Sequence, residues 1–131
     1  MDTNKTFIIA ELSANHVGRI EKARETVTAA ANAGADAIKL QTYTADTMTI
    51  DSDRPEFLAA TKETIWEGRR LYELYEQAHT PWEWHAELKD QAESLGLTWF
   101  STPFELSAVD FLDDLGTGLY KIASFEITDV P

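Results

Sequence analysis

Residues 33–42 read AGADAIKLQT, and this stretch decides the fold. The glycine at position 34 stands where a residue in the left-handed conformation ends a helix. The apolar run from Ala37 to Leu40 follows, interrupted only by Lys39, and the polar pair Gln41-Thr42 comes directly after it. A nearly continuous apolar strand that follows a helix is typical of a parallel sheet buried on both faces.

The same alternation continues in both directions along the chain. Further apolar runs are Phe7 to Ala10, Leu97 to Phe100 and Leu119 to Ala123. The predicted helices between the runs have three apolar stripes, which are Ile20, Ala23, Val27, Ala30 and Ala31; Trp84, Leu88, Ala92 and Leu95; and Val109, Leu112 and Leu115. A capping box over Thr80-Pro81-Trp82-Glu83 is expected to begin the second helix. The order of elements predicts an α/β fold with four parallel strands and right-handed crossovers.

One connection is longer than the others and runs from Thr42 to Gly96. It contains a polar break over residues 51–55 and an amphipathic helical pattern from Thr64 to Ala78 that is interrupted near Gly68. A long insertion after the carboxyl end of a strand usually builds the wall of an active site or an interface. We expect this connection to serve one of those two purposes.

Composition excludes several classes of protein. The chain has 131 residues, the size of one domain, and its formal net charge of −12 disfavours binding to nucleic acids or to anionic membranes. Because there is no cysteine, disulfides, thiolate chemistry and cysteine zinc sites are excluded. The apolar run near the amino terminus is too short for a signal peptide or a membrane span, so a soluble, cytoplasmic protein is expected.

Two lysines interrupt apolar runs, and each would be costly to bury without a partner. Lys39 and Lys121 can each pair with a strand acid such as Glu11 or Glu126, or they can bind a small anion with several charges. The residues leave both interpretations open. The position of both lysines near the carboxyl edge of the sheet, where ligands bind in α/β folds, favours the anion.

Other polar residues give weaker signals. Asn15-His16 follows the first strand in a loop and can either contact a substrate or bond locally. His79 and His85 have a spacing that does not bring them together as a metal pair, and we interpret them as helix-end residues.

Four segments resemble the amino-terminal part of the sialic acid synthase family. They read IIAELSANHVG, AGADAIKLQTYTADTM, WFSTPFE and YKIASFEITDVP, and a fifth, LYELYEQAHTPWEWH, points to the pseudaminic acid synthase branch of that family. The resemblance implies a (β/α) TIM-type barrel. Residues 1–131 would form its amino-terminal half, with the first four strands, while the second half and an antifreeze-like domain would be absent.

The resemblance also implies a reaction and a site. Phosphoenolpyruvate would condense with 2,4-diacetamido-2,4,6-trideoxy-L-altrose and water to give pseudaminic acid and phosphate. The implied catalytic residues are Glu11 and Glu126; those for phosphoenolpyruvate are Lys39, Thr102, Lys121 and Ser124; those for the sugar are Asn15 and Gln41. The family uses a divalent metal, manganese or magnesium, whose ligands would lie outside this chain, so no residue here is expected to bind it.

Further expectations follow from the length. A complete barrel needs about 250 residues, so we expect a truncated chain that is inactive alone and that self-associates through exposed strand edges. The alternatives are a fragment of an N-acetylneuraminate or legionaminate synthase, a non-catalytic self-associating half-barrel, or an unrelated α/β phosphate-binding module.

Overall fold

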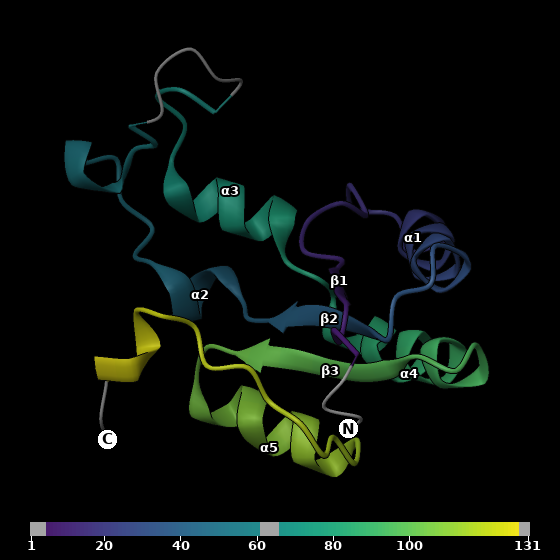
Figure 1. Ribbon diagram of the computed structural model, residues 1–131. Coiled ribbons are helices and arrows are strands. Elements are labelled where there is room, and N and C mark those ends of the chain that lie inside the picture. Colours follow the sequence, from purple (N-terminus) through teal and green to yellow (C-terminus); the bar gives the residue numbers. More distant parts are fainter. Residues whose placement is uncertain (1–4, 61–65, 129–131) are drawn as a thin grey trace.

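A computed structural model describes residues 5–60 and 66–128 (Figure 1). The strands are β1 (Ile9–Glu11), β2 (Ala37–Thr42) and β3 (Thr98–Pro103). The α-helices are α1 (Ile20–Asn32), α2 (Ala45–Met48), α3 (Leu71–Ala78), α4 (His85–Ser94) and α5 (Leu106–Asp114). Short 3-10 turns occur at Pro55–Phe57, Trp82–Trp84 and Glu126–Thr128. In this part of the chain, no helix is both long enough and apolar enough to cross a membrane.

The strands form a parallel sheet in the order β1-β2-β3, as the alternation of runs predicts. Glu11 pairs with Lys39, and the register continues from β2 to β3 with Lys39 opposite Phe100 and Gln41 opposite Thr102. Because paired residues in a sheet point to the same side, this register places Glu11, Lys39, Gln41 and Thr102 on one face.

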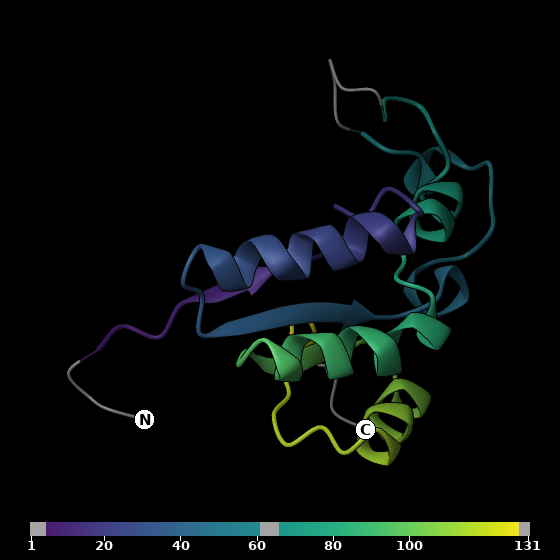
Figure 2. The ribbon, with the colours of Figure 1, turned by 90° about the vertical axis from the view of Figure 1, so that its right-hand side faces the viewer.

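The core lies on the other face of the sheet, under α1, α4 and α5. Ile38 and Leu40 of β2 pack there with helical residues such as Val27, Leu88 and Leu112, all with no exposed surface. Figure 2 looks onto α1 and α4, which lie side by side in front of the strands. Since α1, α4 and α5 all pack on this side, they leave the face that carries Lys39 uncovered.

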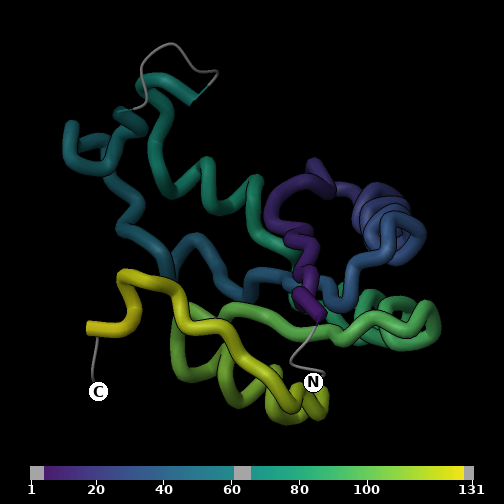
Figure 3. The backbone as a smooth tube through the Cα atoms, viewed as in Figure 1, coloured from purple at the N-terminus to yellow at the C-terminus, as the bar shows by residue number. Residues whose placement is uncertain are grey.

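The fourth predicted strand is only partly formed. Residues 119–123 run beside β3 (Figure 3), but their pairing is a single parallel bridge between Tyr120 and Ser101, with the Lys121 amide donating to the Ser101 carbonyl at 3.2 Å. The prediction of four strands is therefore wrong for the described residues, whose sheet has three strands. Tyr120 packs against the core and Ala123 is buried, but Leu119 and Ile122 are 38% and 56% exposed, so only part of this segment is packed.

The predicted helix ends are partly correct. Gly34, Gly96 and Gly116 adopt positive φ directly after their helices, as predicted. The capping box at residues 80–83 is wrong, because Pro81 is extended and a 3-10 turn precedes α4, which begins at His85 without a side-chain cap. Two residues expected to face the core, Leu95 and Val109, are 42% and 37% exposed.

The long connection contains α2, α3 and α4; the first two are short helices above the carboxyl ends of the strands, and α4 packs on the core face. The predicted helix over residues 64–78 begins only at Leu71, after a turn in which Gly68 has φ of +72°, and residues 64 and 65 lie outside the described part. Arg70 joins the polar break to α3, because it forms ion pairs of 2.5 Å with Asp51 in the break and with Glu73 on α3.

Candidate active site

The face opposite the helices carries an ion pair at the carboxyl end of the sheet. The Nζ atom of Lys39 lies 3.0 Å from Oε1 of Glu11, and the lysine side chain is only 10% exposed. The Ser13 hydroxyl donates to the same Glu11 oxygen at 2.6 Å. The structure therefore contains the pairing with Glu11 that the sequence left open for Lys39.

Glu11 is a carboxylate at neutral pH. The Ser13 hydrogen bond lowers its pKa most, and the hydrogen bond and charge of Lys39 and the charge of Lys121 lower it further, while partial burial opposes them. A carboxylate that is ionised and only half-buried can accept a proton from a bound substrate or water.

Lys121 reaches the same site from the segment after α5. It lines a hollow of about 710 Å³ together with Glu11, Lys39 and apolar residues, which are Phe7, Ile9, Phe100, Leu119, Tyr120 and Ile122. Among the described residues, Lys121 makes no ion pair, so its alternative pairing with Glu126 is not found. The site thus has two ammonium groups and one carboxylate, an excess of positive charge on a protein whose net charge is −12. We call this site the charged hollow.

The other site residues predicted from the sequence do not line the charged hollow. Thr102 is 1% exposed on the same face of β3, and its hydroxyl has no hydrogen-bond partner in the described part of the chain. Gln41, next to it in the register, lines a second hollow. Ser124 and Glu126 line neither hollow, and the Asn15 amide bonds locally to the Leu12 carbonyl at 2.8 Å.

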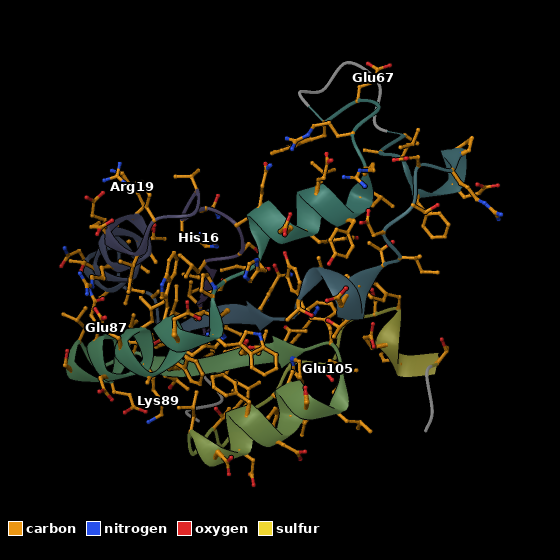
Figure 4. The ribbon with its side chains drawn as sticks, turned by 180° about the vertical axis from the view of Figure 1, so that it is seen from behind. His16, Arg19, Glu67, Glu87, Lys89 and Glu105 are labelled. Atoms are coloured by element: carbon orange, nitrogen blue, oxygen red, sulfur yellow. The ribbon has the colours of Figure 1, made fainter. Side chains whose placement is uncertain are left out.

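His16 belongs to the packing of the fold. His16, which is labelled in Figure 4, has no exposed surface. Its Nδ1 accepts from the Gly18 amide at 3.0 Å, and its ring meets Trp84 edge to face. Burial lowers its pKa and keeps the ring neutral. His16 therefore fixes the loop after β1 and does not line either hollow.

The second hollow was not predicted from the sequence. It has a volume of about 440 Å³ and lies against α3; its residues are Ser13, Ala14, Gln41, Tyr43, Ala59, Ala60, Trp66, Leu71, Leu74, Tyr75 and Ala78. We call it the apolar hollow. The spacing of Leu71, Leu74, Tyr75 and Ala78 on a helix was the available signal, but it does not say which surface the helix covers.

A chain of hydrogen bonds behind the site was also missed. The Nδ1 atom of His85 lies 3.2 Å from the Pro81 carbonyl, which can only accept, so Nδ1 carries the proton. The Nε2 atom then accepts from the Thr42 hydroxyl at 2.9 Å, and Thr42 in turn accepts from Ser101 at 2.7 Å. This chain joins α4, β2 and β3 next to Gln41 and Thr102.

A metal site is not apparent. Within residues 5–60 and 66–128, no three histidine, aspartate or glutamate side chains come together in a way that could hold a metal ion. The charged hollow has a single carboxylate, which Lys39 already neutralises, so its donors do not fit a divalent cation.

Comparison with known proteins gives the family. Residues 26–131 match the NeuB family. The pseudaminic acid synthases of Campylobacter jejuni and Helicobacter pylori are 51% and 48% identical over 95% and 94% of this chain, which corresponds to 36% of each relative. The N,N'-diacetyllegionaminic acid synthase of Legionella pneumophila is 40% identical over 95% of this chain and 35% of its own length.

The fold has a counterpart among solved structures. The N-acetylneuraminic acid synthetase of Leptospira borgpetersenii, crystallised with citrate, aligns with a TM-score of 0.74 at 29% identity, over 96% of this chain and 39% of that one. The chain thus spans about a third of the length of the curated relatives it matches. With its parallel sheet, its one-sided layer of helices and a match over residues 26–131, the chain belongs to the NeuB family.

Proposed function

We propose that this chain is the amino-terminal half of the (β/α) barrel of a pseudaminic acid synthase, a transferase. The reaction would condense phosphoenolpyruvate with 2,4-diacetamido-2,4,6-trideoxy-L-altrose and water, and release pseudaminic acid and phosphate. The higher identity to pseudaminic acid synthases than to the legionaminic enzyme supports this sugar. The observation that carries the proposal is the convergence of Glu11, Lys39 and Lys121 at one hollow.

The charged hollow suits phosphoenolpyruvate because that substrate is a small anion with several charges. Lys39 and Lys121 would bind its phosphate and carboxylate. The Thr102 hydroxyl, which has no partner within the described residues, and the Ser124 hydroxyl do not line the hollow in this structure, and we propose that they donate to the substrate's oxygens when it binds. Glu11 neutralises Lys39 in this structure, which avoids an isolated buried charge. When the substrate binds, its own negative charge takes over that task.

The chemistry then follows from charge and position. Carbon 3 of phosphoenolpyruvate attacks the sugar aldehyde, water adds to carbon 2, and phosphate leaves from the tetrahedral intermediate. Glu11, ionised at neutral pH, would accept a proton from the reacting groups, and Glu126 would face the sugar and the attacking water. We propose that Gln41 and Asn15 bind the sugar. The manganese or magnesium ion would be held by residues outside this chain.

Two related reactions are alternatives, because the alignments cover only about a third of the length of each relative. The 40% identity to a legionaminic acid synthase favours a legionaminate or N-acetylneuraminate precursor as the second candidate. Phosphate release, measured with the full-length protein, phosphoenolpyruvate and each of the three sugars in turn, would distinguish them. An enzyme of this kind would work in the cytoplasm.

Calorimetric titration of the full-length protein with phosphoenolpyruvate tests the site. We expect Lys39→Met and Lys121→Met each to weaken binding by about tenfold or more, because each removes a charged hydrogen bond of about 1.5–3 kcal/mol. Lys89→Met is the matched control, since Lys89, labelled in Figure 4, pairs with Glu93 on α4 and does not line the charged hollow. Wild-type affinity in both site variants would contradict the assignment.

A further inference from the structure

The apolar hollow adjoins the charged hollow along the same strands. Ser13 comes two residues after Glu11, and Gln41 comes two residues after Lys39 on the same face of β2. Ser13 links the two hollows, since it lines the apolar hollow while its hydroxyl donates at 2.6 Å to Glu11, which lines the charged hollow. A ligand in the apolar hollow would therefore lie beside an anion held by Lys39.

The wall of the apolar hollow is fixed by packing. Tyr43 is 4% exposed, and its ring meets Tyr75 of α3 and Phe104 edge to face, with centroids 5.9 Å and 5.5 Å apart. The Trp82 indole donates to the Tyr43 carbonyl at 3.3 Å and holds its backbone. Leu74 stands next to Tyr75 on the same helix and lines the hollow too. A preformed wall of this kind selects ligands by shape.

The lining has little polarity. None of the described residues that line the apolar hollow is charged, and its polar side chains are Ser13, Gln41 and three aromatic residues with one polar group each, Tyr43, Tyr75 and Trp66. Burial raises the pKa of Tyr43 to about 12, so its hydroxyl is neutral. A hydroxyl-rich group would lose hydrogen bonds to water here, whereas a group with one amide and one methyl would lose few.

We propose that Tyr43, Leu74 and Tyr75 are specificity-determining residues that hold an acetamido group of the sugar. The methyl group would pack against Leu74 and Tyr75, and the Gln41 carboxamide would bond the amide of the ligand. This inference rests on the proposed function, and it names the residues that would select an acetamido substituent. The volume of about 440 Å³ lies within the usual range for small-molecule sites, about 300–1,000 Å³.

Steady-state kinetics of the full-length protein test the wall. We expect Leu74→Gln to raise KM for 2,4-diacetamido-2,4,6-trideoxy-L-altrose by about tenfold and to change KM for phosphoenolpyruvate by less than about twofold, because it places a polar group in an apolar wall. Leu74→Met keeps the wall apolar, so we expect it to retain the wild-type KM for the sugar. The control Leu95→Gln, on a half-exposed leucine after α4, leaves both constants unchanged. With an analogue that has a hydroxyl in place of the 4-acetamido group, we expect the KM values of Leu74→Gln and wild type to differ less than they do with the diacetamido sugar.

The other possible results separate a failure of this inference from a failure of the proposed function. An unchanged sugar KM in Leu74→Gln, or an equal rise for both substrates, overturns the inference. If the wild-type protein turns over none of the sugars, the proposed function fails, and calorimetric binding of the diacetamido sugar decides the inference separately. A loss of binding in Leu74→Gln then supports it, and equal or no binding in both proteins overturns it.

Discussion

Thr42 occupies the middle of the buried hydrogen-bond chain, between His85 and Ser101. We expect Thr42→Val to lower the free energy of unfolding by about 1–3 kcal/mol, because it leaves the Nε2 atom of His85 without a donor. Thr42→Ser keeps the hydroxyl and is expected to retain most of the stability. Thr117→Val is the control, since the Thr117 hydroxyl is buried without a partner in the described part of the chain. Urea denaturation measures the stability of all three variants. A Thr42→Val variant as stable as the wild type would contradict a stabilising role of this hydrogen-bond chain.

His85 makes a second prediction at this scale. Burial lowers its pKa to about 4. Between that value and the unfolded pKa near 6.5, the unfolded state binds the additional proton, so stability is complete above about pH 6.5 and declines by up to about 3 kcal/mol as pH falls towards 4. Imidazole nitrogen shifts measured by NMR should show a neutral ring with a proton on Nδ1 at pH 5.5. A ring that titrates near pH 6.5 would refute this.

At the scale of single elements, Gly34 ends α1 with φ of +82°. An added Cβ would meet no atom within 4 Å, so the cost of Gly34→Ala is conformational alone. We expect it to lower the free energy of unfolding by about 1–2 kcal/mol. Gly118→Ala is the matched control, because Gly118 has equal space but no positive φ. If Gly34→Ala and Gly118→Ala are equally stable in urea, the positive φ of Gly34 does not make an alanine costly at the end of α1.

The elements also show what could be predicted from the sequence. Strand β2 and the end of α1 were predictable because local rules govern them: an apolar run and a glycine. The ion pair of Lys39 with Glu11 was predictable as one of two alternatives, because a charge inside an apolar run needs either a partner or a ligand. The apolar hollow was not, because Tyr43 and Tyr75 are 32 positions apart and meet only through the path of the long connection. The start of α4 was missed because Pro81 stays extended.

At the scale of the whole molecule, the net negative charge opposes self-association, whereas the exposed apolar side chains favour it. Ile9, Ile122 and Phe125 are 47%, 56% and 64% exposed, while the net charge is −12. We expect the isolated 131-residue polypeptide to self-associate more as salt screens its negative charge. Sedimentation velocity at low and high salt measures this, with Ile9→Glu as the variant that associates less. A monomer at every salt concentration would contradict it.

The order β1-β2-β3 also has a consequence for synthesis on the ribosome. Each strand pairs with the one made before it, so β1, α1 and β2 can assemble as soon as residue 42 has emerged, with the Glu11–Lys39 pair already formed. Strand β3 has to wait for the long connection, and because that connection must close first, we expect β3 to dock after β1, α1 and β2. The two lysines would thus enter the site at different times, Lys39 early and Lys121 only after α5.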